Sequence, residues 1–425
     1  MEVTELPEEV WLHVFHFLSY SEKCSIRSSC TFFKRLIDRP VLWKNTTVHL
    51  EKLRFIKNHF WRTLGNRRIK SVVVQKADEK EWAQLASRLP WLQSLTVNVC
   101  CSALHSLGDL RHLKRLVLRR CCCPSLTALT SLHLLSDLCL CEVTRAPRSD
   151  ISNAVCHLTN LTSLHYHESR TPLSTAALHN ILQCLPNLQH LSLKMGSNQY
   201  PVPSDYFCPA QTNHISENLL CTMGSLLSLE LLNYMDPVLP PTGLQGLTSL
   251  KCLTVHYRGW AQEPKPCHLK TWLSTLPVLS ELNISMGYQL GVYAKSVPAT
   301  VHRLSLKHVM GELQALQDVA LQVPDLQHLH LDLCFQERQS LIANVPKFFP
   351  KLQSLAVRHH NVPEAEFLKL AKLTSLRSLV ILDSSTDPNS PLKVLTYKLH
   401  IQTNYRVHVI HFSDLKDQSA CFCVN

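Results

Sequence analysis

A leucine-centred pattern recurs along most of the chain. Its form is aliphatic-x-x-Leu-x-x-Leu-x-aliphatic, and its copies begin at Leu89, Leu110, Leu132, Leu158, Leu185, Met223, Leu247, Leu276, Pro298, Val323, Phe349 and Leu373. The third position is leucine in every copy, and the second is leucine in all but one, where Val301 replaces it. Successive copies start 21 to 29 residues apart, except for one step of 38 residues before Met223. The pattern therefore predicts a repeat array rather than one compact core.

Each copy predicts one short strand followed by a return. Leucines two apart, such as Leu191 and Leu193, lie on the same side of a strand. Amphipathic segments such as 174–186 and 268–277 separate the strands and predict helices, and a proline near the start of the next copy ends many of them. The predicted fold class is α/β: a curved solenoid with parallel strands on its concave side and helices on its convex side.

This pattern resembles the leucine-rich repeat, in the class in which a cysteine can occupy the asparagine position. Cys100, Cys121 and Cys334 occupy that position here, and we expect buried thiols that serve packing. Weaker copies at 66–74 and 401–409 predict the atypical end repeats that a solenoid needs where it meets water.

The long step contains an insertion at 194–214 that is rich in proline, serine and aromatic residues. A surface loop of this kind is either a tolerated insertion or a contact for a partner. The predicted domains are 1–47, a helical module; 48–75, a basic helical linker with a cap repeat; 76–382, the repeats; and 383–425, a C-terminal cap and tail.

The helical module at the N-terminus has a different pattern. Pro7 and two following glutamates mark a helix start, and seven of the nine residues in 10–18 are apolar. A surface helix buries only one stripe, so the rest of this helix should be covered by its own domain or by a partner. A second amphipathic helix follows, with Ser21 as its predicted N-cap and Pro40 at its end, before the apolar residues 41–43.

This order of elements resembles the F-box. The matching residues are Leu6, Pro7, Glu9, Val10, Phe15, Leu18, Cys30, Leu36, Leu42 and Trp43. The chain differs from the family at Lys23–Ser25, where F-boxes usually carry leucines, and at Phe33, where they usually carry tryptophan.

The F-box resemblance implies that the module binds a Skp-type adaptor and, through it, a cullin–RING ubiquitin ligase. The residues that it implies for adaptor binding are Leu6, Pro7, Glu9, Val10, Val14, Phe15, Leu18, Leu42 and Trp43. The alternative is a helical cap packed on the repeats.

Charge adds a candidate binding face. The chain has 43 Lys and Arg against 32 Asp and Glu, a net charge of +11. Residues between the strand leucines should face the concave side, and the candidate substrate-binding residues there are Arg115, Arg119, His165, His167, His190, Lys194, Arg303, Lys307, His328, His330 and Arg358. Acids on this strip are fewer: Asp137, Glu230, Glu281 and Asp332.

This strip favours an acidic or phosphorylated protein substrate, and its histidines should gain charge below about pH 6.5. The alternative is a solvated face that only reflects the overall charge. A second basic run precedes the repeats: Lys52, Arg54, Lys57, Arg62, Arg67, Arg68, Lys70 and Lys76. We interpret this run as a solvated face rather than a nucleic-acid site, because aromatic stacking residues are sparse there.

The remaining features argue against other classes of protein. The N-terminus lacks a signal-peptide pattern and no run of 18 apolar residues occurs, so we expect no membrane segment and a reducing compartment in which the 18 cysteines are free. His165 and His167 lie two apart with no third metal ligand apparent, so no metal site is predicted. Phosphate-loop, nucleophile-elbow and H-E-x-x-H motifs are missing from the sequence, which argues against an enzyme and against a cofactor.

The sequence thus predicts a non-catalytic, substrate-recognition subunit of a Skp–cullin–F-box ubiquitin ligase. The module would bind the adaptor, and the repeats would bind a protein for ubiquitination and proteasomal degradation in the cytoplasm or nucleus. The alternative is a leucine-rich-repeat interaction scaffold that engages no ligase.

Overall fold

A computed structural model describes residues 6–100, 104–168, 172–195, 201–207, 224–261, 266–334, 338–358, 362–383 and 391–411. Met223, most of the 194–214 insertion and the tail after residue 411 lie outside the described residues. The chain forms two compact units, residues 1–165 and 166–425. No described helix has both the length and the apolar composition needed to cross a membrane.

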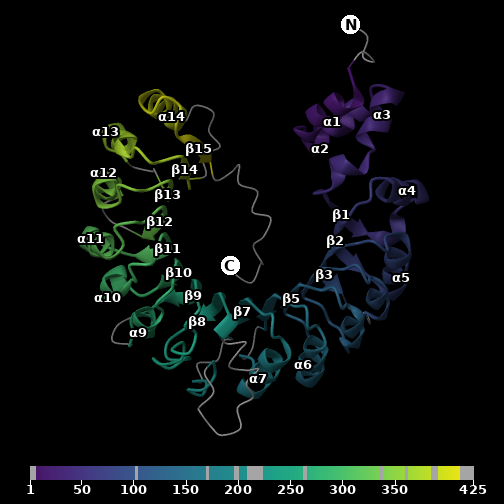
Figure 1. Ribbon diagram of the computed structural model, residues 1–425, viewed down its shortest axis with the longest axis horizontal. Helices are drawn as coiled ribbons and strands as arrows, with labels where there is room; N and C mark the ends of the chain where they lie inside the picture. Colours follow the sequence, from purple (N-terminus) through teal and green to yellow (C-terminus); the bar gives the residue numbers. More distant parts are fainter. Residues whose placement is uncertain are drawn as a thin grey trace. The chain divides into compact units, whose positions relative to one another are not determined.

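The first unit begins with helices and continues into strands that alternate with helical returns (Figure 1). Its α-helices are α1 (Glu8–His16), α2 (Tyr20–Arg27), α3 (Thr31–Ile37), α4 (Asn58–Asn66), α5 (Glu79–Arg88) and α6 (Arg148–Cys156). Its strands are β1 (Thr47–Lys52), β2 (Ser71–Ala77), β3 (Ser94–Cys100), β4 (Arg115–Arg119), β5 (Asp137–Cys141) and β6 (Ser163–His167), the last of which contains the boundary between the units. Short 3-10 helices are η1 (Pro40–Trp43), η2 (Leu53–Phe55), η3 (His105–Asp109) and η4 (Thr127–Ser131).

The predicted second helix of the module is two helices, and its N-cap differs from the prediction. Ser19, not Ser21, caps α2, in a capping box with Glu22. The helix ends at Arg27 because the hydroxyls of Ser28 and Ser29 bond to backbone carbonyls one turn earlier and compete with helix continuation. α3 then starts after Cys30.

The segment 48–75 was predicted as a helical linker with a cap repeat, and it contains more sheet than that prediction implies. β1 pairs in parallel with β2, so the array of strands starts at Thr47. The weak front copy is confirmed as a strand, since Val72 and Val74 are fully buried in β2. The domain boundaries themselves stay predictions.

The second unit repeats the strand-and-return plan. Its strands are β7 (His190–Lys194), β8 (Ser228–Tyr234), β9 (Cys252–Trp260), β10 (Glu281–Gly287), β11 (Arg303–Met310), β12 (His328–Cys334), β13 (Ser354–Val357), β14 (Ser378–Ile381) and β15 (His408–His411). Its helices are α7 (Thr175–Cys184), α9 (His268–Thr275), α10 (Leu290–Tyr293), η5 (Ala294–Ser296), α11 (Leu313–Gln322), α12 (Arg338–Phe348), α13 (Glu364–Leu368), η6 (Lys369–Lys372) and α14 (Pro391–Gln402). The returns predicted at 174–186 and 268–277 are confirmed as α7 and α9.

The repeat leucines align from strand to strand and form the core. In the first unit Leu95 lies beside Leu116, and Leu116 beside Leu138. In the second unit one row of partners runs through Leu229, Leu253, Leu282, Leu304, Leu329, Leu355, Leu379 and Val409. All strands pair in parallel and follow their order in the sequence within each unit. The predicted leucine-rich-repeat fold is confirmed.

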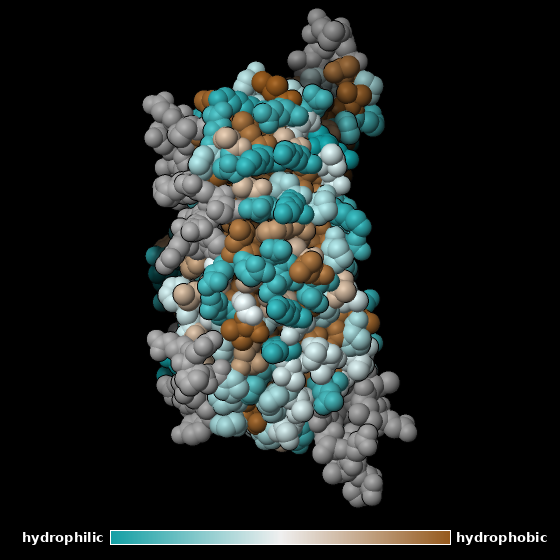
Figure 2. Space-filling view, turned by 90° about the vertical axis from the view of Figure 1, so that its left-hand side faces the viewer, coloured by the Kyte–Doolittle hydropathy of each residue, from teal (hydrophilic) through white to brown (hydrophobic). Residues whose placement is uncertain are grey.

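Helices cover one face of the strands in each unit and leave the other face, which we call the open face, without them (Figure 1). On the side of α10 to α13, hydrophilic residues are interspersed with small groups of apolar ones (Figure 2). Scattered apolar residues are ordinary on a protein surface and mark no binding site.

Gly287 at the end of β10 is required by close packing. Its φ is +81°, and a Cβ there would lie 2.4 Å from the Tyr257 ring. Only glycine fits both the backbone conformation and the space. Tyr257 in turn packs edge-on against Tyr234 and Tyr288.

The cysteines depart from the sequence prediction at two points. Cys100 and Cys121 are buried as expected, but Cys334 is exposed, because it lies at the end of β12. Twelve described cysteines are free thiols, whereas Cys141 is disulfide-bonded, so the prediction that all the cysteines are free is wrong at Cys141. Several cysteines lie at the ends of neighbouring strands in this region. The backbones of Cys100 and Cys121 form an isolated parallel β-bridge.

Candidate functional site: the helical module and the open face

The module exposes an apolar surface on and around α1. Its exposed members are Leu6, Val10, Val14, Phe17, Tyr20 and Val41. Phe17 is 74% exposed and Tyr20 is 62% exposed. Large apolar side chains gathered at this exposure on a small domain are typical of a protein-binding surface.

Other predicted adaptor-binding residues lie inside the module. Phe15, Leu42 and Trp43 are buried, and Phe15 packs edge-on against Phe33. These three side chains help to form the core of the module and so fix its shape; their part in adaptor binding stays a prediction. Pro7 and Glu9 are exposed at the start of α1, and Leu18 is half-buried just after the helix.

Sequence reasoning missed three contributors to the exposed surface: Phe17, Tyr20 and Val41. Phe17 belongs to the apolar run 10–18. This run has more apolar residues than one buried stripe needs, and that excess was the available signal. Tyr20 and Val41 are separated from α1 in sequence, and only the packing of the helices shows their exposure.

Ion pairs hold the module together and join it to the first repeat coil. Asp38 pairs with Arg27 at 2.9 Å and with Arg67 at 2.8 Å. Burial alone would raise the pKa of Asp38, but hydrogen bonds from the two guanidinium groups lower it. Arg67 also stacks on the Trp43 ring at 3.7 Å. Arg67 is buried, so its interpretation as part of a solvated basic face was wrong.

The open face carries the predicted basic strip in the expected alternation. In β4, Arg115 is exposed and Arg119 half-buried, while Leu116 and Leu118 face the core. In β7, His190 and Lys194 likewise alternate with Leu191 and Leu193.

The same alternation holds in β11 and β12, whereas in β6 His165 is half-buried and His167 is buried. In β11, Arg303 and Lys307 are exposed. His328 and His330 of β12 are half-buried on this face.

Part of this strip is neutralised by its own acid. Asp332 accepts two hydrogen bonds from Arg358, one of them 2.9 Å from Nη2 to Oδ2, and lies 3.5 Å from His308. Burial would raise the pKa of Asp332, but the hydrogen bonds and charge of Arg358 lower it. Arg358 is therefore engaged within the protein, unlike the exposed Arg303 and Lys307.

Two of the histidines will not charge as the sequence suggested. Burial, with the charge of Lys307 as the next cause, lowers the pKa of His330 to about 4. Burial and then Arg303 also lower the pKa of His328. The expected gain of positive charge just below pH 6.5 therefore fails at these two positions.

A polar network crosses neighbouring strands on the open face of the second unit. The Ser192 hydroxyl donates to Glu230, and His167 Nε2 lies 2.7 Å from the same hydroxyl oxygen. Because a hydroxyl donates only one hydrogen bond, His167 Nε2 carries its proton and donates to Ser192. His256 Nε2 lies 3.6 Å from the other Glu230 oxygen.

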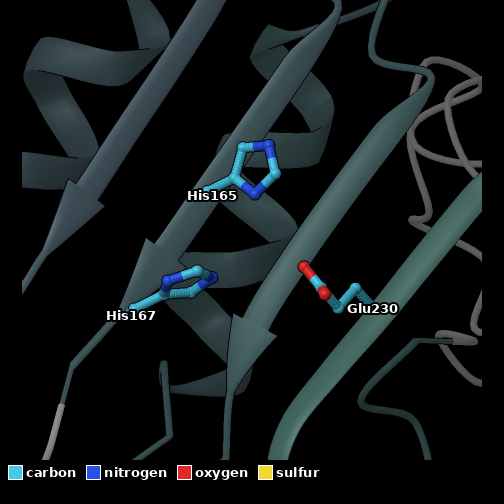
Figure 3. Close-up of side chains that lie close together, drawn as sticks. All are labelled: His165, His167 and Glu230. Carbon is cyan, nitrogen blue, oxygen red and sulfur yellow. The ribbon is translucent and has the colours of Figure 1, made fainter. Parts of the chain in front are cut away.

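Glu230 is the third donor that sequence reasoning did not find near the β6 histidines. In Figure 3 its carboxylate points toward His167, and His165 lies two residues earlier on the same strand. Imidazoles and a carboxylate are ligand types that zinc uses. The Glu230 carboxylate, however, already accepts a hydrogen bond from Ser192 and lies within ion-pair distance of His256.

Comparison with known families supports the assignment of the N-terminal module. Residues 3–49 match the family model described as F-box-like. A search of curated proteins found no match.

Solved structures similar to this chain include repeat proteins of low identity. An internalin (inlF) from Listeria monocytogenes is 17% identical, with a TM-score of 0.39, over 76% of this chain and 81% of that chain. A leucine-rich-repeat protein of Leptospira interrogans is 16% identical, with a TM-score of 0.36, over 87% and 91%. The chain in a TLR13–ssRNA13 complex is 16% identical, with a TM-score of 0.40, over 81% of this chain but 55% of that one. At these TM-scores the likenesses support no conclusion about function.

Proposed function

We propose that this chain, an F-box-like module followed by leucine-rich repeats, is the substrate-recognition subunit of a Skp–cullin–F-box ubiquitin ligase. The observation that carries the proposal is the exposed apolar surface of the module, with Phe17 and Tyr20 at its most exposed points, inside a segment that matches an F-box-like model. The module binds the Skp-type adaptor, and the repeats bind a protein substrate in the cytoplasm or nucleus. Catalysis takes place in other subunits, and this chain holds the substrate close to them.

The substrate side of the proposal rests on the open face. After pairing within the protein is taken into account, the exposed cations Arg303 and Lys307 of β11 are the strongest candidates to contact an acidic or phosphorylated segment. Arg115 on β4 is a further exposed cation. Reversing Arg303 and Lys307 to glutamate should remove acidic partners from a pull-down and leave adaptor binding intact.

Co-purification of the full chain with a Skp-type adaptor tests the adaptor side. Val14→Asp combined with Phe17→Asp should abolish association, because it places charge in an apolar interface. Val394→Asp is the matched control, since Val394 is an exposed valine on α14, and it should bind like the unmodified chain. The ligase role would be refuted if the unmodified chain did not bind the adaptor. It would also be refuted if binding survived the Val14 and Phe17 changes.

A further inference from the structure

The edge of the sheet next to the helical module holds a cavity of about 730 Å³. It is lined by residues of β1, η2 and the start of α4: His49, Leu50, Glu51, Lys52, Phe55, Ile56, Lys57, His59 and Phe60. We call it the β1 groove. It belongs entirely to the first unit, and no residue of the helical module 6–43 lines it.

The β1 groove is lined by lysine and histidine side chains that form no ion pair with the residues that the structure describes. Lys52, Lys57, His49 and His59 line it, against Glu51 as the one acid in the lining. Among the described residues none of these four side chains takes part in an ion pair. This contrasts with Arg27, Arg67 and Arg358, whose charges are used internally.

Apolar and aromatic side chains lie among these lysines and histidines. Phe55 is 66% exposed, with the Arg54 guanidinium 4.7 Å and the Lys52 ammonium 5.8 Å from its ring centroid. Ile56 and Phe60 add half-buried apolar surface. A ligand that fits this lining carries acidic groups together with apolar ones.

The backbone of β1 adds a second kind of complementarity. β1 is the terminal strand of the sheet, and β2 is its one partner among the strands that the structure describes. An edge strand offers a row of N–H and C=O groups to another extended chain, and peptides bind other proteins in this way. His49, Glu51 and Lys52 are exposed along this strand.

We propose that the β1 groove is a docking site for an extended acidic segment of a protein partner, which adds to the sheet as a strand beside β1. Its backbone pairs with the edge of β1, its acidic side chains contact Lys52 and Lys57, and its apolar side chains pack on Phe55 and Phe60. This site is separate from the exposed surface of α1 and does not depend on the ligase role, so either can fail without the other.

The test uses the full chain and a fluorescein-labelled octapeptide of alternating glutamate and valine, with binding followed by fluorescence anisotropy. Affinity should fall as salt rises, and Lys52→Glu combined with Lys57→Glu should weaken binding at least about tenfold. Lys251→Glu combined with Lys270→Glu changes the net charge equally at exposed sites of the second unit, and it should change affinity less than about twofold. If the glutamate variant is poorly folded, Lys52→Gln with Lys57→Gln gives the same direction.

Two further ligands test whether the partner is a peptide that binds as an extended strand. The same peptide with alternate backbone nitrogens methylated keeps its charge but cannot pair fully with a strand, and it should bind about tenfold more weakly. Equal binding of the methylated peptide, or equal loss in the two charge-reversal variants, would overturn the proposal. So would an oligouridine that binds more tightly than the peptide and displaces it, since that result assigns the groove to single-stranded RNA.

Discussion

The helical module and the repeats differ in how completely they bury their apolar residues. In the repeats, the leucines at the second and third pattern positions are buried, and polar residues of the same strands are in part paired with each other, as Asp332 is with Arg358. In the module, Phe15 and Trp43 fill a small core while Val14, Phe17 and Tyr20 remain exposed. The repeats complete their own packing, whereas the module keeps apolar surface that a partner can cover. Stability and binding should therefore respond to mutation differently in the two regions.

The largest effect is expected where the repeats bury a leucine. Leu229→Asp in β8 should lower the free energy of unfolding by more than about 4 kcal/mol, because the charge has no partner in the core. Urea denaturation followed by circular dichroism measures it.

Glu230→Ala is the adjacent control on the open face. It should cost less, about 1–2 kcal/mol, because it removes the contacts of Glu230 with Ser192 and His256. Equal losses at positions 229 and 230 would contradict the strand register.

Close packing within the second unit predicts the next effect. Gly287→Ala should destabilise the protein by about 2–4 kcal/mol, because a Cβ at φ +81° would meet the Tyr257 ring. Gly291→Ala in α10 is the matched control, with only ordinary contact to Ala315, and should be neutral or slightly stabilising. Thermal unfolding of both variants checks the pair, and a stable Gly287→Ala protein would show that Tyr257 can move aside.

A pH effect is expected to be smaller and confined to the repeats. The pKa of His330 is lowered to about 4 in the folded protein, so between about pH 6.5 and pH 4 the unfolded chain binds a proton that the folded chain does not. Stability should therefore fall as the pH falls through this window. His330→Gln should flatten the decline in the urea midpoint between pH 7 and pH 4.5, and a slope unchanged by this substitution would place the effect elsewhere.

The smallest effect on stability is expected at the module's most exposed side chain. Phe17→Ser should change the free energy of unfolding by no more than about 0.5 kcal/mol, because little of the Phe17 ring is buried. Phe15→Ser, two residues earlier and buried, should cost several times more, about 3 kcal/mol. Calorimetry of the two variants makes the contrast; a large loss at Phe17 would mean that its ring supports the module and is not available to a partner.

The repeat fold was predictable because the signal is redundant. Even the weakest copy, with Pro298 and Val301 at two of its positions, forms β11 in register with its neighbours, since the adjoining coils impose the pairing. β1 was not predicted, because Thr47–Lys52 carries one buried apolar residue, Leu50, and no leucine pattern. A strand with one buried residue can still form by pairing with β2, and the sequence of β1 does not show that pairing.

The candidate sites were predicted less well, because burial and pairing depend on residues far apart in sequence. Arg358 looked like a free cation until Asp332, 26 residues earlier, was found to bind it. The burial that lowers the pKa of His330 likewise comes from neighbouring strands. The alternation along each strand placed these residues on the correct face, but their charge states required the three-dimensional contacts.

The regular register between neighbouring strands has a consequence for how such a chain can be shortened. Glu281 begins β10 opposite Cys252 of β9 and Arg303 of β11. Removal of residues 281–302 would bring Arg303 into the sequence position that Glu281 now holds, so the residues of β11 would keep their faces beside β9. Val309 would then take the position of Gly287, where a side chain meets the Tyr257 ring. The alternation of faces is therefore common to these coils, whereas some contacts belong to one coil alone, and a shortened array must keep glycine at that position.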